Sequence, residues 1–396
     1  MFSEIIKTTS LRKDCLMKKV KNHLYLLFIL LTVFSLILSG CGKSESSQSS
    51  GSEIRVAFIY KEKIVDYNWS YIHEVGRQYL VEQLPDIEIK YVEEVAVDQV
   101  EKVLRDLAGE GYKLIFATAP EFSAAVLAVA KEFPDTFFEV CQGTETAANV
   151  ATYDGRMYQA FYVAGGYVGE LTVKDMIGFV APEPSVEVIR NINAMALSTL
   201  LVRSFEGLTI HVKWTGSWND PAADRAAAIE LIEEGADVLI QHTYSSEVQK
   251  VAEEYGVRSF GYGFDMREFA PTKNATSIVY DWGWYYLNRV NAVADGTWKG
   301  EAYLGKVSAK NFGAGIIDLA PYTYVQIPQI MEAPPMKWRT RFVETNKDVF
   351  EGPIKDQAGN VVLAKGESFD DAYIYNEMDW FVFGVVGESP GEPPVK

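Results

Sequence analysis

The stretch Ile54-Arg-Val-Ala-Phe-Ile-Tyr60 is a short apolar run rich in β-branched and aromatic residues. It opens a regular alternation, in which each such run is followed by an amphipathic segment and a short connection. Strands that alternate with helices in this way form a parallel sheet that is covered by helices on both faces. The strands expected in this first series are 54–60, 87–92, 113–118 and 136–141, and the expected helices are about 70–83, 98–110 and 121–133.

A segment rich in small residues, 153–171, follows the first series and is expected to be a helix. No strand leads into a phosphate-binding glycine loop there, so we expect its glycines to allow close helix packing. A second series then repeats the alternation, and a crossing strand, 276–280, with a helix, 282–294, leads back toward the first series. The strands expected in the second series are 176–180, 208–214, 237–241 and 257–260, and the helices are 185–204, 221–234 and 245–255.

Two successive α/β units with a returning segment predict two doubly wound lobes with a cleft between them. After Pro334 the pattern changes, because 351–360 reads as strand, turn and strand and 378–383 reads as another apolar strand. The predicted fold is therefore α/β, with two parallel-sheet lobes, a hinge and a small C-terminal β extension. The expected boundaries are 54–153 for the N-terminal lobe, 154–280 for the second lobe, 281–333 for the return to the first lobe and 334–396 for the extension.

The N-terminus combines basic residues, an apolar run and a cysteine in one order. A group of lysines at 18–21 precedes the apolar run 24–38. This run has the length of a signal-peptide core and is short for a membrane span. It ends in Leu-Ser-Gly before Cys41, which resembles the lipobox of bacterial lipoproteins.

The lipobox resemblance implies that residues 1–40 are a signal peptide and that Cys41 carries the lipid. Met17 opens a cleaner signal than Met1 does. The polar, serine-rich stretch 41–53 would then be a flexible tether. Double acylation of the cysteine would hold the chain at the membrane. The alternative is an uncleaved anchor helix.

The charge and the cysteines narrow the class of protein. The formal net charge is −17, which argues against nucleic acid and anionic lipid as partners. Cys141 is the only cysteine after Cys41, so the mature chain has neither a disulfide within one monomer nor a zinc site made of cysteines. His73-Glu74 is followed by Arg77 where a zinc-binding helix needs a second histidine, and no serine-nucleophile elbow or Walker loop occurs. We therefore expect no metal, no cofactor and no enzymatic activity.

Aromatic and acidic residues gather at the expected strand ends and loop starts. Each aromatic residue, taken alone, is more often a core residue than a ligand contact. However, all four regions lie at expected strand ends or loop starts, which favours a shared aromatic-lined cleft. Such a cleft suits a planar ligand that donates hydrogen bonds, because stacking is worth about 1–3 kcal/mol per base and a carboxylate accepts from N–H groups. His242, at the end of an expected strand, is as often a structural histidine as a ligand contact. The four regions are 66–71, 153–158, 216–220 and 280–284.

Several segments together indicate one family. They are 68–77, 149–153, 162–165, 189–194, 217–221, 241–243, 281–283, 295–298 and 352–357. Through these segments the sequence resembles, from about Ile54 to the C-terminus, the basic membrane protein family of ABC-transporter substrate-binding lipoproteins, which includes purine nucleoside receptors. The resemblance implies a type I periplasmic-binding-protein-like fold and a solute held between the two lobes.

The family resemblance also implies which residues bind the solute. An aromatic residue after Gly-Ser stacks on the purine in this family, which corresponds to Trp218, and the loop after the first strand supplies Trp69 and Asn68. The region that would hold a ribose, 263–265 and 280–282, lacks the family's lysine, which makes the chain similar to the branch suited to a free base such as adenine. Asp281 is the expected acceptor for N–H groups of the base, and the further expected contacts are Tyr158, His242, Asp265 and Trp282.

The implied function is that of a lipid-anchored protein on the extracytoplasmic face of the cell membrane, which delivers a purine base or nucleoside to an ABC permease. Closure is expected as a hinge motion near 153–175 and 276–283. Two readings of the same fold stay open, a receptor that reports the solute to a signalling partner and a binder of a non-purine solute. A glycosidase or nucleosidase would need two carboxylates as acid and base, for which Asp265 and Asp281 are the candidate pair.

Overall fold

The computed structural model describes residues 54–65, 67–203, 207–308, 315–323, 326, 333–345 and 347–394. The expected signal peptide, Cys41 and the serine-rich tether lie outside these residues. Residues 53–396 form one compact unit. No helix in the described part of the chain combines the length and the apolar character that a membrane crossing needs.

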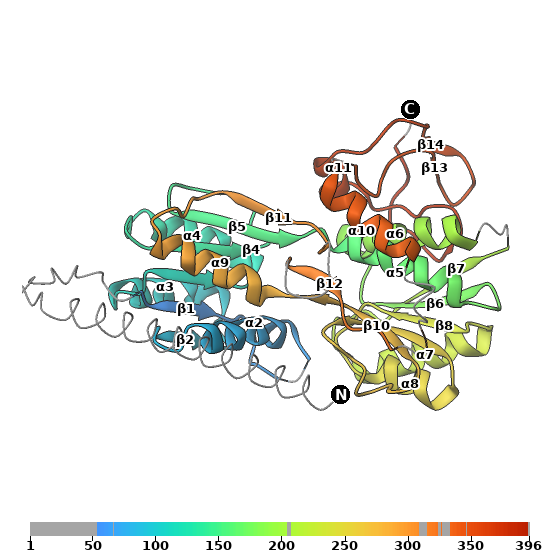
Figure 1. Cartoon of the computed structure of the whole chain (residues 1–396), viewed down its shortest axis with the longest axis horizontal. Coiled ribbons are helices and arrows are strands. Elements are labelled where there is room, and N and C mark those ends of the chain that lie inside the picture. Colours follow the sequence, from blue (N-terminus) through green and yellow to red (C-terminus); the bar gives the residue numbers. More distant parts are fainter. Residues whose placement is uncertain are drawn as a thin grey trace, which may run out of the picture. The chain divides into compact units, whose positions relative to one another are not determined.

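The first lobe contains a six-stranded parallel sheet (Figure 1). Its strands are β1 (Val56–Ile59), β2 (Ile89–Val92), β3 (Leu114–Ala117), β4 (Phe137–Cys141), β5 (Val150–Gly155) and β11 (Ala302–Gly305). They lie in the order β11-β5-β4-β3-β1-β2, and every neighbouring pair is parallel. Along β1, Val56 and Phe58 face one core cluster while Ala57 and Ile59 face another. This sheet is therefore buried on both faces, as its uninterrupted apolar strands predict.

Helices cover both faces of the first sheet. They are α2 (Trp69–Gln83), α3 (Val100–Gly109), α4 (Ser123–Ala130) and α9 (Trp282–Ala294), with two short 3-10 turns, η1 (Val97–Gln99) and η2 (Pro120–Phe122). α2 packs against α9, and α3 packs against α4. Gly76 allows the first of these contacts, because a Cβ at this position would lie 2.7 Å from the Cβ of Trp282. The chain thus returns to the first lobe with α9, which completes the helical layer on that face of the sheet.

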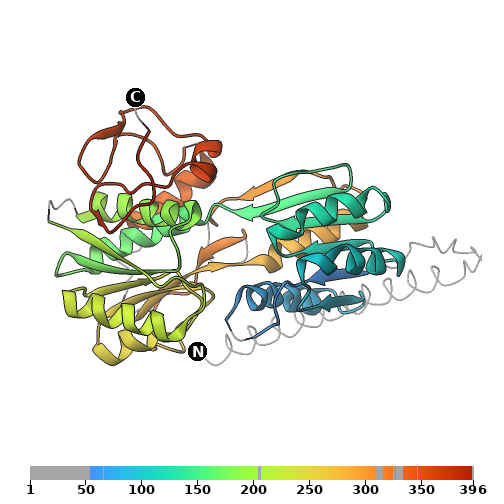
Figure 2. The ribbon, with the colours of Figure 1, turned by 180° about the vertical axis from the view of Figure 1, so that it is seen from behind.

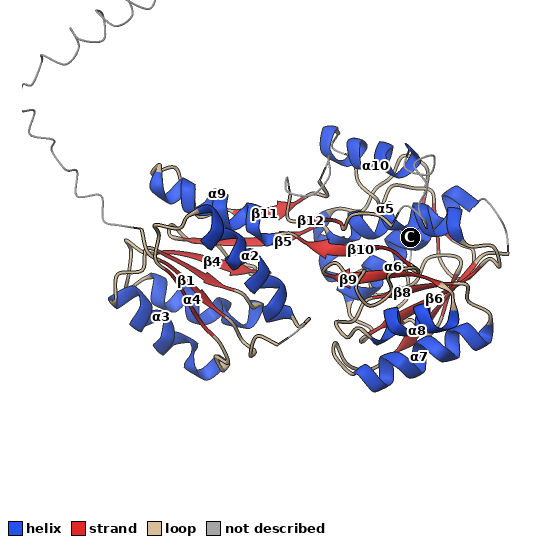
Figure 3. Cartoon of the chain, turned by 60° about the horizontal axis from the view of Figure 1, so that its bottom comes forward, coloured by secondary structure: helices blue, strands red, loops and turns tan. Residues whose placement is uncertain are grey.

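The second lobe contains a seven-stranded sheet, which Figure 3 shows between its own helices. Its strands are β6 (Met176–Ala181), β7 (Thr209–Trp214), β8 (Val238–Gln241), β9 (Arg258–Gly263), β10 (Asn274–Tyr280), β12 (Ile317–Leu319) and β15 (Val385–Val386). They lie in the order β12-β10-β9-β8-β6-β7-β15. β12 runs antiparallel to β10, and the other neighbouring strands are parallel.

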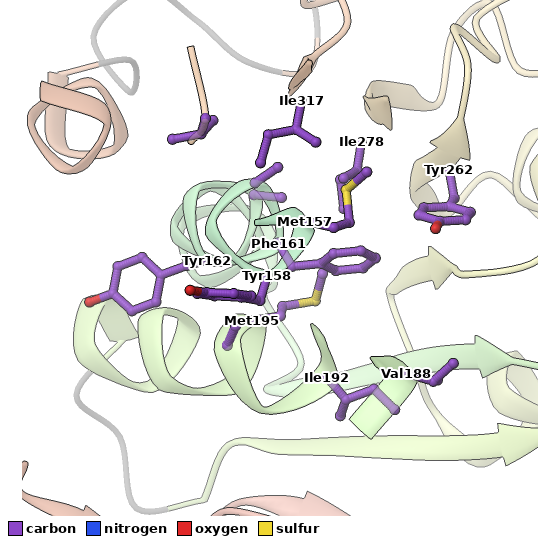
Figure 4. Close-up of a cluster of buried hydrophobic side chains, with 14 of the residues drawn as sticks. Met157, Tyr158, Phe161, Tyr162, Val188, Ile192, Met195, Tyr262, Ile278 and Ile317 are labelled. Atoms are coloured by element: carbon purple, nitrogen blue, oxygen red, sulfur yellow. The ribbon is translucent and has the colours of Figure 1, made fainter. Parts of the chain in front are cut away.

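The helices of the second lobe are α5 (Met157–Leu171), α6 (Val186–Arg203), α7 (Pro221–Glu234) and α8 (Glu247–Tyr255). All residues of α5 except Glu170 are buried. A Cβ on Gly165 would lie 2.2 Å from Ser198 Oγ and 2.4 Å from the backbone oxygen of Met195, both on α6. The prediction that glycines allow close helix packing here is therefore confirmed. Figure 4 shows side chains of α5 and α6 in one buried cluster.

The chain passes between the lobes three times, from β5 to α5, from β10 to α9 and from β11 to β12 (Figure 2). The first passage corrects the expectation that a helix begins at Tyr153, because Tyr153 pairs with Tyr303 within the sheet. A strand buried on both faces carries no period-two alternation, so its small and apolar residues were mistaken for the start of the helix. The third passage corrects the expected return of 281–333, because β12 belongs to the second sheet.

The C-terminal extension packs on the second lobe. Its elements are α10 (Ala333–Glu344), β13 (Ile354–Lys355), β14 (Val361–Leu363), α11 (Asp371–Asn376) and β15, which joins the edge of the second sheet beside β7. The predicted hairpin at 351–360 is confirmed by the β13–β14 pair. The predicted strand at 378–383 is wrong, because this segment forms none of the named strands. Most of it is buried, with Phe383 exposed, and the backbone of Trp380 and Val382 bonds to the amide side chain of Asn193. A short apolar run is buried in either case, so its pattern does not distinguish the two.

Candidate functional site

A cleft of about 550 Å³ lies between the two lobes, at the carboxyl ends of their strands. The first lobe lines the cleft with the loop after β1 and with the segments that follow β3 and β4. The second lobe lines it with the first turn of α6 and with the loops after β7 and β8. Ligands of doubly wound sheets bind at such strand ends. The lining includes Trp69, Gln142, Glu187, Trp218 and Tyr244.

Trp69 forms the first-lobe wall of the cleft in a fixed orientation. It is the first residue of α2, and its indole Nε1 donates to the backbone oxygen of Thr118 at 2.8 Å. Asn68 caps the same helix, because its Oδ1 accepts from the backbone N–H of Tyr71 at 2.9 Å. The Asn68 Nδ2 donates to the backbone oxygen of Lys63 at 2.8 Å. The amide of Asn68 is therefore engaged in shaping the loop that carries Trp69, and its direct contact with a solute stays a prediction.

Trp218 and Tyr244 form the second-lobe wall. Their rings are stacked with centroids 5.4 Å apart and an interplanar angle of 24°, and the Tyr244 N–H donates to the backbone oxygen of Trp218 at 2.8 Å. The indole Nε1 of Trp218 donates to Glu183 at 3.3 Å. The loops after β7 and β8 are thus joined into one aromatic surface. Together with Trp69, this surface gives the cleft an aromatic wall in each lobe, as the sequence predicts.

His242 supports Trp218 from behind. The side chain is fully buried and meets the Trp218 ring edge-on at 5.5 Å. One ring nitrogen lies 3.3 Å from Nδ2 of Asn191. Burial lowers the pKa of His242 to about 3, so the imidazole is neutral at physiological pH. The structure therefore corrects the expected ligand contact, because the end of β8 turns this side chain into the lobe interior.

Two carboxylates lie near each other: Glu187 lines the cleft from the first turn of α6, and Asp154 lies in β5. Burial raises the pKa of both carboxyl groups, that of Asp154 to about 7, and the charge of Glu187 adds to the rise at Asp154. The guanidinium of Arg190 opposes both shifts, but it lies over the ring of Tyr375 at 4.0 Å. The backbone N–H of Gly155 donates to Asp154 Oδ1 at 2.7 Å. No ion pair joins Glu187 to a basic side chain among the residues that the structure describes.

Aromatic rings of the two lobes also meet beside the cleft. Tyr67, next to the Asn68-Trp69 pair, is stacked on Phe264 with ring centroids 4.6 Å apart and an interplanar angle of 14°. Its hydroxyl donates to Glu268 at 3.0 Å. Tyr67 has a φ of 77°, which is a strained conformation for a residue with a side chain. The loop that carries Trp69 is therefore tied directly to the second lobe.

Asp265, Asp281 and Trp282 lie outside the cleft and line a separate cavity of about 720 Å³. Trp282 is 1% exposed and stacked on Tyr280 at 4.7 Å. Asp265 forms an ion pair with Arg267. These placements correct the expectation that Asp281 accepts N–H groups beside Trp218. Asp281 directly precedes α9. Its position is therefore set by the packing of α9 on α2, and not by the end of a strand of the second sheet.

Tyr158 also lies outside the cleft. It is fully buried, and its hydroxyl donates to Asp348 of the C-terminal extension at 2.7 Å. Arg156 binds the same carboxylate at 3.0 Å and Asp371 at 2.6 Å. The period of α5 turns Tyr158 toward the extension, so the structure corrects its expected role as a ligand contact. It joins α5 to the extension instead.

The sequence prediction named Asn68, Trp69 and Trp218 of the cleft lining and missed the rest, including Gln142, Glu187 and Tyr244. Gln142 directly follows β4, Glu187 lies in the first turn of α6 after β6, and Tyr244 lies in the loop after β8. The strand-end rule, applied to every strand, would have found all three. None of the three stands in a cluster of tryptophan and aspartate like those of the four expected regions.

A solute-sized cleft between two doubly wound lobes is the architecture of the periplasmic-binding-protein class of solute-binding proteins. A solved ABC-transporter solute-binding protein from Conexibacter woesei shows the same fold, with a TM-score of 0.64, 20% identity and coverage of 75% of this chain and 100% of that chain. Residues 53–319 match the Bmp family, described as ABC transporter substrate-binding protein PnrA-like. The chain belongs to this family of ABC-transporter substrate-binding proteins.

Two curated relatives resemble most of the chain. A purine-binding protein of Brucella abortus is 33% identical over 364 residues, which cover 91% of this chain and 99% of the relative. A candidate ABC transporter glucose-binding protein of Haloferax volcanii is 32% identical over 343 residues, which cover 86% of this chain and 83% of the relative. The names of these relatives thus differ in the solute.

Proposed function

We propose that the chain binds a purine base, with an adenine-like base favoured over a nucleoside, between Trp69 and Trp218. The observation that carries this proposal is the position of the two tryptophans in opposite lobes on the wall of one cleft of about 550 Å³. Flat aromatic faces stack on any base at about 1–3 kcal/mol each. The volume lies within the range of small-molecule sites. The name of the Brucella relative supports a purine ligand.

A sugar is the second candidate ligand, because the name of the Haloferax relative assigns it glucose. The two candidates differ in what the walls would contribute. A purine has two aromatic faces and fills the space between two tryptophans, whereas a sugar needs many polar partners for its hydroxyls. Several polar residues do line the cleft, but Lys61 is paired with Glu121, and the Asn68 amide caps α2. The polar lining residues are Lys61, Glu62, Lys63, Asn68, Glu121, Gln142, Glu187 and Asn219. The aromatic walls therefore favour the purine.

The test is a binding screen of the full-length chain, purified in detergent, against adenine, guanine, adenosine, glucose, ribose and amino acids. A ligand at 100 times its dissociation constant stabilises the folded state by about 2.7 kcal/mol, which a thermal-shift measurement detects. We expect a shift with purines. Trp218→Ala should weaken purine binding at least about 10-fold, because it removes one stacking face.

Trp214→Ala is the matched control, since Trp214 lies in the same lobe but packs on Phe381 outside the cleft. It should bind purines as the unaltered chain does. Stabilisation by sugars alone, or full purine affinity in Trp218→Ala, would overturn the proposal.

The proposal extends to the place and partners of the molecule. The lysines, the apolar run and the lipobox support a lipid anchor at Cys41 on the extracytoplasmic face of the membrane, with an ABC permease as the partner that receives the solute. The lobes would close over the solute by bending at the passages between them. The chain would act without chemistry on the ligand, so adenosine incubated with it should stay intact.

A further inference from the structure

We propose that Glu187 is the residue that recognises the N–H edge of the bound base, with Gln142 lining the same cleft. This inference rests on the proposed function, and it assigns the selectivity of the same site. It replaces the expected role of Asp281, which faces a different cavity. The inference concerns free bases that donate hydrogen bonds.

The position of Glu187 gives it access to a ligand. It lies in the first turn of α6 and lines the cleft together with both tryptophans. Its charge also reaches Tyr244 on the cleft wall, because after burial it is one of the causes that raise the pKa of that hydroxyl. A base stacked between the aromatic walls would therefore present its edge to this carboxylate.

The hydrogen-bonding capacity of Glu187 is unused within the protein. Among the described residues its carboxylate accepts no side-chain hydrogen bond and forms no ion pair. A partly buried carboxylate without partners is costly unless a ligand supplies them. Arg190, whose charge lowers the pKa of Glu187 against the effect of burial, lies over the ring of Tyr375 and donates to the backbone oxygen of Ile374. It forms no ion pair with Glu187 among the residues that the structure describes.

The neighbours of Glu187 reinforce its role as an acceptor. Gln142 lines the same cleft from the first lobe, and its side-chain oxygen can accept a hydrogen bond. Asp154 lies near Glu187, because the charge of Glu187 is, after burial, a cause of the raised pKa of Asp154. A ligand with N–H donors therefore finds acceptors on the cleft wall in Glu187 and Gln142.

The test is calorimetric titration of the full-length chain in detergent with adenine, unsubstituted purine and 9-methyladenine. Unsubstituted purine lacks the exocyclic amino group, and 9-methyladenine lacks the ring N–H, while both keep the stacking faces. We expect Glu187→Gln to bind adenine at least about 10-fold more weakly, because a hydrogen bond to a charged acceptor is lost. The preference for adenine over at least one analogue should shrink toward one in the same variant.

Glu170→Gln is the matched control, because Glu170 is exposed on α5 and the change removes the same charge. It should leave all three affinities unchanged. Glu187→Gln should unfold at the same or a higher temperature than the unaltered chain, since it removes a poorly compensated buried charge, so weaker binding cannot result from misfolding. Glu187→Asp keeps the charge, but its side chain is one methylene group shorter, so its carboxylate lies further from the ligand. This variant should lose affinity for adenine as well.

The outcomes separate the two proposals. If the unaltered chain binds adenine and Glu187→Gln binds it within twofold with the same analogue preferences, the role of Glu187 is refuted while purine binding stands. If the unaltered chain binds none of the three bases, both proposals fail.

Discussion

At the residue scale, the sequence predicts the positions of the two tryptophans of the cleft better than the positions of its acidic residues. Trp69 and Trp218 were placed correctly, because each is large, costly to expose and close to a strand end. Asp281 and Glu187 are both acidic residues, and the sequence alone does not distinguish their positions. Tertiary packing places Glu187 on the wall of the cleft and Asp281 on the wall of another cavity. An acid's environment is set by residues far along the chain, such as Tyr375 near Arg190.

The raised pKa of Asp154 predicts how the free energy of unfolding depends on pH. Its pKa rises on folding from 3.8 to about 7, so the folded chain holds a proton that the unfolded chain releases. The free energy of unfolding should therefore fall as the pH rises from about 4 to about 7, by an amount on the order of 4 kcal/mol. Asp154→Asn removes the titration, so its stability relative to the unaltered chain should grow across this window. Urea denaturation at pH 4.5, 6 and 7.5 measures the difference.

The control for this pH series is Asp86→Asn, because Asp86 is exposed on the turn after α2. A constant difference for Asp154→Asn would contradict the prediction.

At the scale of elements, the sequence predicts best those helices whose ends are marked by capping residues. The prediction of α7 is confirmed at both ends, because Asp220 accepts from the N–H groups of Ala222 and Ala223 and Pro221 occupies the first turn. The helices α10 and α11 of the extension were not predicted. They are short or weakly patterned, and packing on the second lobe stabilises them more than their own propensity does.

The contact between α5 and α6 gives a prediction about stability. Gly165→Ala should lower the free energy of unfolding by about 1–3 kcal/mol, because the new Cβ would lie 2.4 Å from a backbone oxygen that cannot rotate away. Gly109→Ala should be neutral or stabilising, since nothing lies within 4 Å of a Cβ there and alanine favours a helix. Chemical denaturation compares the two. Equal or greater stability of Gly165→Ala would show that the helices have room to separate.

At the scale of the whole molecule, the lipobox predicts where the chain resides. Cys41→Ala should move the full-length protein from the membrane fraction to the soluble fraction of a bacterial host, because the lipid would no longer be attached. Purine binding should be unchanged, since Cys41 precedes the compact unit 53–396. Retention of the variant in the membrane fraction would favour the uncleaved anchor helix. Immunoblots of the two fractions, with the unaltered chain beside the variant, provide the measurement.

The order of strands and helices, the two lobes and the aromatic cleft followed from hydrophobic period, capping residues and strand-end rules, all of which act between residues near each other in the chain. Four further features did not follow: the strand β5, the third passage between the lobes, the burial of Tyr158 against the extension, and the choice of Glu187 over Asp281. Each depends on contacts between segments that are distant in the chain, such as Ile278 with Leu319 and Tyr158 with Asp348. Such contacts form only when the lobes have packed, and no local pattern records which partner a side chain will meet.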